Sequence, residues 1–114
     1  MKCDNRAVVV TGASGGIGSA TCERLRKDGY WTIGVDRVAA IGGHVDAHTV
    51  RDLDVVGRSD AEATVAAMEI RSLAGGRAIH GIVHAAALQL FGPIELLPVE
   101  DFLRAIIVNV AAPY

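Results

Sequence analysis

The sequence predicts an α/β fold in which a doubly wound parallel sheet carries helices on its faces, with about four strands and three helices. Three observations lead to this prediction. Short apolar runs alternate with stretches of helical periodicity, the first run is continuous and β-branched as in a strand buried on both faces, and a glycine-rich segment follows it directly. Right-handed crossovers between such strands build the first half of a doubly wound sheet.

The expected elements follow from local patterns along the 114 residues. Gly29 stops the first helix, and Ser59 with Glu62 three residues later forms a capping box at the start of the second. We expect strands over residues 7–10, 31–35, 48–53 and 80–84, helices over 16–28, over 60–73 and from 99 onward, and a loop that could hold one helical turn over 37–47. The length supports one domain and no second one.

Composition excludes several classes of function. The net charge of -2 gives no broad basic field for nucleic acid, and no apolar run approaches the roughly 20 residues of a membrane span. Cys3 and Cys22 lack metal-ligand spacing and are expected to be reduced thiols, with no metal site. The expected location is the cytoplasm.

Residues 11–18 read Thr-Gly-Ala-Ser-Gly-Gly-Ile-Gly and link the first strand to the first helix. Gly12 allows a tight turn, the missing side chain at Gly16 lets the backbone approach a pyrophosphate, and Gly18 lets the helix pack closely on the strand. The helix N-terminus offers free N–H groups and the positive end of its dipole to phosphates. This context favours a Rossmann-type dinucleotide-binding domain over a purely structural turn.

Asp36 ends the second strand, 18 residues after Gly18. A carboxylate there can accept both ribose hydroxyls of an adenosine and would repel a 2′-phosphate, which favours NAD over NADP as the cofactor. The neighbouring Arg37 points the other way, because a guanidinium can partner a 2′-phosphate. The alternative is a solvated aspartate without a ligand.

The glycine segment resembles the TGxxxGxG signature of classical short-chain dehydrogenases/reductases, and the resemblance extends over essentially the whole chain. It implies an NAD(P)-dependent oxidoreductase that moves a hydride between the nicotinamide and a small-molecule carbonyl/alcohol pair. Val108-Asn109-Val110 is similar to the segment whose Asn belongs to the family's catalytic tetrad and helps to order a proton-relay water. The alternative for Asn109 is a helix-capping amide. By the same resemblance, the cofactor-binding residues of the segment are Gly12, Ser14, Gly15, Gly16, Ile17 and Gly18.

Two further segments would meet the cofactor by this resemblance. An acidic residue after the third strand contacts the adenine amino group, and either Asp52 or Asp54 could fill that role. Asp54 is favoured because Val55-Val56 and then the capped helix follow it. The family's Asn-Asn-Ala-Gly segment corresponds to His84-Ala85-Ala86-Ala87, in which only Ala86 is kept and Ala85 and Ala86 line the cofactor.

The family's catalytic Ser and its YxxxK pair have no counterpart in this chain. Tyr30 and Tyr114 are its tyrosines, and neither precedes a lysine by four residues. We therefore expect residues 1–114 to be an NAD(P)-binding domain that is incomplete at its C-terminus, with a bare edge on the fourth strand that a second copy or a complementing chain could cover. The first alternative is a non-catalytic nucleotide-binding module that needs a partner. The second is a piece of the extended, sugar-nucleotide-modifying branch, since residues 11–18 also fit TGxxGxxG and His84-Ala85-Ala86 resembles that branch's His-x-Ala-Ala.

Overall fold

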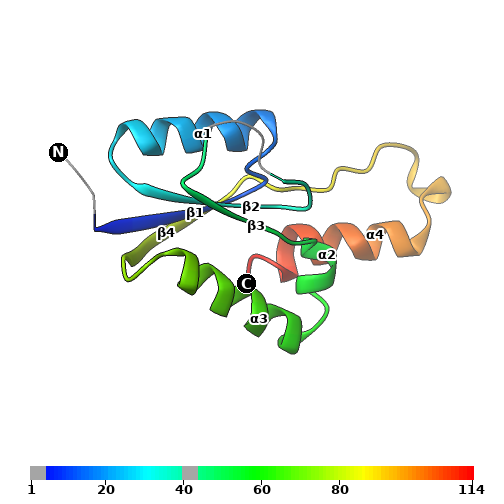
Figure 1. The fold of residues 1–114 in the computed structure, drawn as a ribbon. Helices are drawn as coiled ribbons and strands as arrows, with labels where there is room; N and C mark the ends of the chain where they lie inside the picture. Colours follow the sequence, from blue (N-terminus) through cyan, green and yellow to red (C-terminus); the bar gives the residue numbers. More distant parts are fainter. Residues whose placement is uncertain (1–4, 40–43) are drawn as a thin grey trace.

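Four parallel strands form one sheet in the order β3-β2-β1-β4 in the computed structural model, which describes residues 5–39 and 44–114 (Figure 1). The strands are β1 (Arg6–Thr11), β2 (Trp31–Asp36), β3 (Ala47–Val50) and β4 (Ala78–His84). Because every pair is parallel, each connection must return along a face of the sheet. The predicted fold class, the N-terminal portion of a doubly wound parallel sheet, is confirmed.

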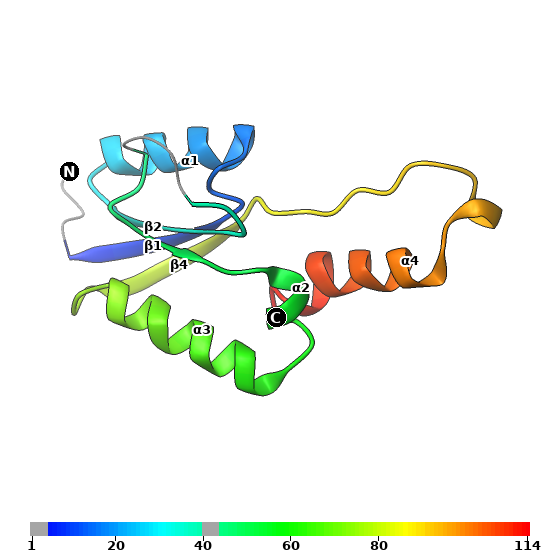
Figure 2. The ribbon, with the colours of Figure 1, turned by 45° about the vertical axis from the view of Figure 1, so that its right-hand side comes forward.

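Helices cover both faces of this sheet, as Figures 1 and 2 show. Helix α1 (Gly16–Lys27) joins β1 to β2 on one face, and α3 (Asp60–Leu73), after the short α2 (Leu53–Val56), returns to β4 on the other. The chain then runs through η1 (Ile94–Leu96), α4 (Val99–Ile106) and the π-helical turn η2 (Ile107–Ala111). This last part extends beyond the carboxyl ends of the strands and comes back beside α2.

The core lies on the two faces of β1 and β2. Alternate residues of β1 point to opposite faces, so each face receives its own cluster of buried apolar side chains. One cluster contains Ala7, Val9, Ile33, Val35 and Ala74, and the other contains Val8, Val10, Ala13 and Cys22. Burial on both faces explains the continuous apolar run of β1, as predicted from the sequence.

Two expected elements differ from the structure, and two short helices, α2 and η1, were not expected. The third strand was expected over 48–53 but ends at Val50, because Asp52 accepts the Asp54 N–H at 2.9 Å and caps α2 instead. The last helix was expected to be uniform, but it changes to a π-helical turn at Ile107. Residues 40–43 of the expected 37–47 loop, and Cys3, lie outside the described residues.

The remaining boundaries agree with the sequence to within about two residues. The Ser59 side chain caps α3 by accepting the Glu62 N–H at 3.4 Å, and Gly29 follows α1 with a φ of 89°. Within the described residues, strand β4 pairs with β1 and with no other strand, and six of its seven residues are exposed, so the fourth strand is the sheet edge that we expected.

Replacing Gly18 by Ala should destabilise the protein by about 3 kcal/mol, the upper end of the usual cost of overpacking. A Cβ at this position would lie 1.9 Å from the carbonyl oxygen of Gly12, which is backbone and cannot move aside cheaply. The matched control is Gly16→Ala, where a Cβ would meet nothing within 4 Å. Its free energy of unfolding should stay within about 0.5 kcal/mol of the parent in urea titrations. Equal stability of the two variants would contradict the close packing of α1 on β1.

Candidate functional site

A cavity of about 320 Å³ opens at the carboxyl ends of the parallel strands, where ligands of open α/β sheets bind. Its wall is formed by the turn after β1, the end of β2, the start of α2, the segment after β4 and the C-terminal arm. The C-terminal arm is the part of the chain from η1 to η2, residues 94–111. The lining residues are Gly12, Gly15, Val35, Asp36, Arg37, Arg51, Asp52, Leu53, Asp54, Ala85, Ala86, Ala87, Leu88, Arg104 and Val108.

The turn between β1 and α1 is built on backbone contacts. Gly12 has a φ of 67°, donates its N–H to the Val35 carbonyl at 2.8 Å, and would place a Cβ only 2.6 Å from the Ala86 nitrogen. Gly18 would collide with Gly12, whereas a Cβ on Gly16 would point into open space. Glycine is therefore required at 12 and 18 for folding, and at 16 the backbone lies open to an approaching group.

The N-terminus of α1 carries no side-chain cap. Its N-cap residue is Gly15, which has no side chain to accept a backbone N–H, and the first turn holds no acidic residue. The N–H groups at the start of α1 and the positive end of the helix dipole therefore lie next to the cavity, with no carboxylate in the first turn of the helix itself. This arrangement can hold an anion.

Asp36 links the end of β2 to the glycine turn. Its Oδ2 accepts the Ser14 N–H at 3.0 Å, and its Oδ1 accepts the Val38 N–H at 3.4 Å. The carboxylate is thus fixed at the cavity wall by two backbone donors. Arg37 lines the same cavity and makes no ion pair within the described part of the chain.

Both carboxylates after β3 reach the cavity, but they have different partners. Asp52 Oδ1 accepts the Asp54 N–H. Asp54 Oδ1 accepts Arg58 Nε at 3.0 Å, and its Oδ2 lies 3.6 Å from Arg104 Nε. Arg58 Nη2 also donates to Glu100 Oε1 at 3.3 Å, so alternating charges connect α2 to α4.

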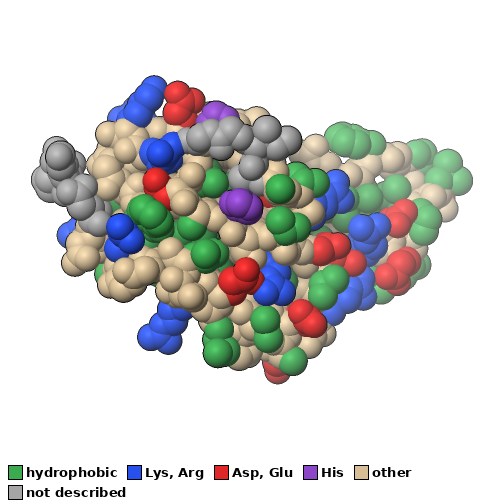
Figure 3. Space-filling view, viewed as in Figure 1, with side chains coloured by type: hydrophobic (Ala, Val, Ile, Leu, Met, Phe, Trp, Pro, Cys, Tyr) green, Lys and Arg blue, Asp and Glu red, His purple; other side chains and the backbone are tan. Residues whose placement is uncertain are grey.

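Arg51 forms an ion pair with Glu69 of α3 beside this cavity. The hydrogen bond from Arg51, with a second from Thr49, holds the pKa of the Glu69 carboxyl below its ordinary value. Figure 3 shows acidic and basic side chains interspersed over the face that carries α2 and α4, with no field of one sign. Around α2 and α4 the charged side chains of the site are therefore mostly ion-paired, whereas Asp36, Arg37 and Asp52 form no ion pair within the described residues.

The segment after β4 is fixed to β1 through Thr11. The Thr11 carbonyl accepts the Ala85 N–H at 3.2 Å, and its Oγ1 accepts the Ala86 N–H at 3.3 Å. His84 Nδ1 lies 3.5 Å from the same hydroxyl. These bonds hold the backbone of Ala85 and Ala86 against the glycine turn.

Asn109 lies in the π-helical turn and binds the backbone of Leu88. Its Nδ2 donates to the Leu88 carbonyl at 2.9 Å and its Oδ1 accepts the Leu88 N–H at 2.8 Å. The amide thereby closes a ring across 21 residues and fixes the loop that follows β4. Asn109 is exposed, and its neighbour Val108 lines the cavity.

The cavity therefore gathers about half of the residues expected from the sequence. Those that line it are Gly12, Gly15, Asp36, Arg37, Asp54, Ala85 and Ala86. Those outside its wall are Ser14, Gly16, Ile17, Gly18, Val55 and Asn109. The sequence did not predict the remaining lining residues, which are Val35, Arg51, Leu53, Ala87, Leu88, Arg104 and Val108. Helical spacing would have shown that Arg104 and Val108, four residues apart, share a face next to Asn109.

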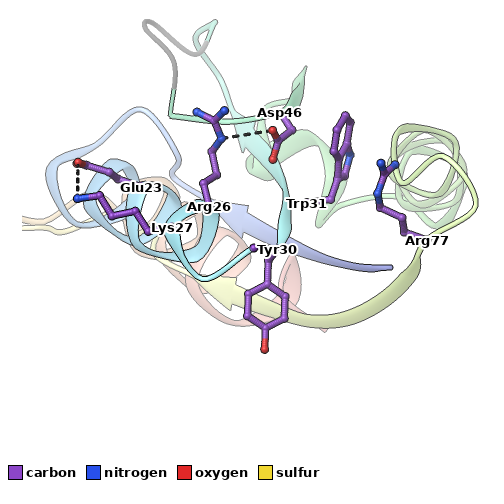
Figure 4. A pocket seen from close by; sticks show the side chains of 8 residues that line it. Glu23, Arg26, Lys27, Tyr30, Trp31, Asp46 and Arg77 are labelled. Atoms are coloured by element: carbon purple, nitrogen blue, oxygen red, sulfur yellow. Dashed lines mark ion pairs between the residues drawn. The ribbon is translucent and has the colours of Figure 1, made fainter. Parts of the chain in front are cut away.

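A second hollow of about 600 Å³ lies at the opposite end of the strands and is shown in Figure 4. Arg26 Nε lies 3.3 Å from Asp46 Oδ1, and Lys27 Nζ lies 3.2 Å from Glu23 Oε1. The Arg77 guanidinium stacks 3.9 Å from the Trp31 ring centroid. The charged side chains of this hollow thus already have partners, and none of the residues expected to bind a ligand lies there.

No group of three or more His, Cys, Asp and Glu side chains gathers within residues 5–39 and 44–114 as a metal ion would require. None of the helices in the described part of the chain combines the length and apolar character needed to cross a membrane. The buried thiol of Cys22 is free, and its burial raises its pKa.

Comparison with known proteins gives matches over nearly the whole chain. The family model for short chain dehydrogenase matches residues 6–114. The NADPH-dependent 3-dehydrocapnine reductase of Ornithobacterium rhinotracheale is 32% identical over 111 residues, which cover 94% of this chain and 39% of that protein. The chain thus spans about two fifths of the length of this curated relative.

Solved structures agree with the fold. The ligand-free aldohexose dehydrogenase of Thermoplasma acidophilum matches with a TM-score of 0.81 at 27% identity, over 96% of this chain and 40% of that one. The 3-ketoacyl-(acyl-carrier-protein) reductase of Brucella melitensis in complex with NADH has a TM-score of 0.76 at 24% identity, over 97% of this chain and 47% of that one. At that identity the second likeness concerns the fold alone.

Replacing Asn109 by Asp should release the loop after β4. The carboxylate keeps the bond from the Leu88 N–H but has no hydrogen to give the Leu88 carbonyl, and the two oxygens repel each other. We expect a loss of about 1–2 kcal/mol at pH 7 and faster hydrogen exchange of the Leu88 amide. The loss should shrink below about pH 4, where the protonated carboxyl can donate again. Asn109→Ala is the control, and its loss should not depend on pH in this range.

The Arg51–Glu69 pair should give a stability difference that depends on pH. Because Arg51 lowers the pKa of folded Glu69, the pair stabilises the fold above the carboxyl's unfolded pKa and stops doing so as pH falls through the lowered folded value. Arg51→Met should therefore reduce stability more at pH 7 than at pH 2.5, in urea titrations at both pH values. A Glu69→Gln background should remove this dependence, and a difference that persists there would contradict the assignment.

Proposed function

Because the chain belongs to the short-chain dehydrogenase family, we propose that it binds a nicotinamide adenine dinucleotide and serves an oxidoreductase that moves a hydride between the nicotinamide and a small-molecule carbonyl/alcohol pair. The observation that supports this most is the joining of three features at one cavity. These are the glycine turn, the uncapped N-terminus of α1 and the fixed carboxylate of Asp36.

The residues of the turn fit a pyrophosphate. The open space at Gly16 removes the side chain that would block its approach, and the adjacent N–H groups of α1 supply donors for its oxygens. Gly12, Ser14, Gly15, Gly16, Ile17 and Gly18 would hold this part of the cofactor. When bound, the nicotinamide supplies or accepts the hydride. The residues of this chain bind and orient the adenosine half.

We propose that Asp36 accepts the hydroxyls of the adenosine ribose and that NAD is the preferred cofactor. Each carboxylate oxygen of Asp36 accepts one backbone N–H and keeps further lone pairs for hydroxyl donors. A 2′-phosphate would bring like charge to this carboxylate. Arg37 and the NADPH dependence of the Ornithobacterium reductase favour NADP instead, and the choice is open to direct measurement.

The adenine would lie beside the start of α2, with Ala85, Ala86 and Val55 nearby. Of the two candidate carboxylates, Asp54 has both oxygens beside arginines, whereas Asp52 gives only Oδ1 to its cap. We therefore assign the adenine amino group to Asp52 and give Asp54, favoured from the sequence, the role of holding the arginines. Asn109 is proposed as a positioning residue that acts through Leu88.

A second candidate is a nucleotide-binding module that acts only with a partner. The exposed β4 edge supports it, because Ile79, Ile82 and Val83 are partly exposed along a strand with one free side. A homo-oligomer or a complementing chain would cover this edge.

The relatives differ in their named substrates, so we propose no single substrate. The free thiol of Cys22 fits our expectation of a cytoplasmic protein.

Calorimetric titration with NAD and NADP tests this proposal. The chain should bind NAD more tightly than NADP, and Asp36→Asn should weaken NAD binding about tenfold, as expected for loss of a charged hydrogen-bond acceptor. The same variant should also reduce the preference for NAD over NADP, because the Asp36 carboxylate that repels the 2′-phosphate is gone. Asp28→Asn is the control, since Asp28 pairs with Arg24 on the surface. Equal or tighter NADP binding by the parent chain would overturn the assignment of Asp36.

A further inference from the structure

The C-terminal arm contributes a cation to the wall of the cavity. Arg104 lies on α4 and Val108 lies one turn later in η2, and both line the cavity together with Leu88. The cavity's other residues come from the strand ends, the β1–α1 turn and the start of α2. Figures 1 and 2 show α4 and the turn after it beside α2 and away from α1.

The guanidinium of Arg104 forms an ion pair with Asp54 at one edge. Arg104 Nε lies 3.6 Å from Asp54 Oδ2, and no other ion pair or hydrogen bond of this guanidinium is formed within the described residues. Asp54 is itself held by Arg58, which donates to Oδ1. The two terminal nitrogens and the flat face of Arg104 are therefore left for a ligand.

Arg58 provides an internal comparison. Its side chain is 41% exposed, that of Arg104 is 42% exposed, and both pair with the carboxylate of Asp54. Only Arg104 lines the cavity. Charge and exposure are thus nearly the same for the two arginines. Arg58 also pairs with Glu100, and of the two only Arg104 reaches the cavity.

Resting on the proposed function, we propose that Arg104 is a specificity-determining residue of the cofactor site, whose guanidinium plane packs on the adenine base. Phosphates belong at the start of α1 and the ribose at Asp36, so the base is the part that reaches α2 and the arm. A guanidinium presents a flat, charged surface, and such surfaces stack on nucleobases. Asp54 is the residue that positions it.

Isothermal titration of the 114-residue chain with NAD, NADP, 5′-AMP and nicotinamide mononucleotide tests this inference. Arg104→Ala should weaken NAD and 5′-AMP binding about tenfold or more, the size expected for loss of one base-stacking partner. It should leave affinity for nicotinamide mononucleotide, which has no adenine, unchanged. Arg58→Ala removes a partner of Asp54 but no group of the cavity wall, so it should weaken binding by a smaller factor than Arg104→Ala. Arg24→Ala, which removes a surface pair of α1, should stay within about threefold of the parent for all four ligands. Arg104→Lys keeps the charge near Asp54 without the plane and should behave like Arg104→Ala, with circular dichroism confirming that each variant is folded.

The outcomes separate this inference from the proposal that it rests on. Failure of the parent chain to bind NAD and 5′-AMP would overturn the proposed function. Normal binding by the parent with equal losses in Arg104→Ala and Arg58→Ala would overturn only the base contact, because the effect would then pass through Asp54. A loss confined to NADP would assign Arg104 to the 2′-phosphate and would also overturn the base contact.

Discussion

The arrangement of α1 and the strand ends at the carboxyl end of this sheet depends on how closely the backbone of the β1–α1 turn approaches neighbouring backbone. A Cβ on Gly18 would lie 1.9 Å from the Gly12 carbonyl oxygen, and a Cβ on Gly12 would lie 2.6 Å from the Ala86 nitrogen. At this point α1, β1 and the segment after β4 meet with no side chain between them. Two glycines therefore set where the helix N-terminus lies relative to three strand ends, which fixes the cavity before any ligand contact is considered.

Hydrogen bonds from the other strands converge on the same turn. Thr11, at the end of β1, accepts the N–H groups of Ala85 and Ala86, which follow β4. Asp36, at the end of β2, accepts the N–H of Ser14 in the turn. Each such bond contributes only about 1 kcal/mol to stability, but each ties a different strand to one short segment. Asp36 illustrates the result, because its carboxylate serves the fold through Ser14 while lining the cavity.

The sequence predicted what local patterns control. The β-branched run of β1, the glycine spacing, the Ser59 cap and the position of Asp36 could all be read from it, since each depends on a few adjacent residues. The Asp52 cap was missed because a polar residue near a strand end is compatible with both strand and cap. The contacts of Asn109 with Leu88 and of Arg104 with Asp54 join distant segments, which one sequence cannot pair. They follow only from how the arm packs on α2.

Helix α2 has only four residues, yet it contacts both the cavity and the π-helical turn that holds Asn109. Its N-cap Asp52 and first residue Leu53 line the cavity, while its C-cap Gly57 touches the π-helical turn so closely that a Cβ would lie 2.8 Å from Ile107 Cγ2. Arg58 and Asp54 add charged contacts to Glu100 and Arg104 on α4. A rigid element this short cannot shift at one end without shifting at the other. The wall proposed for the adenine and the turn that holds Asn109 therefore pack on the same short helix.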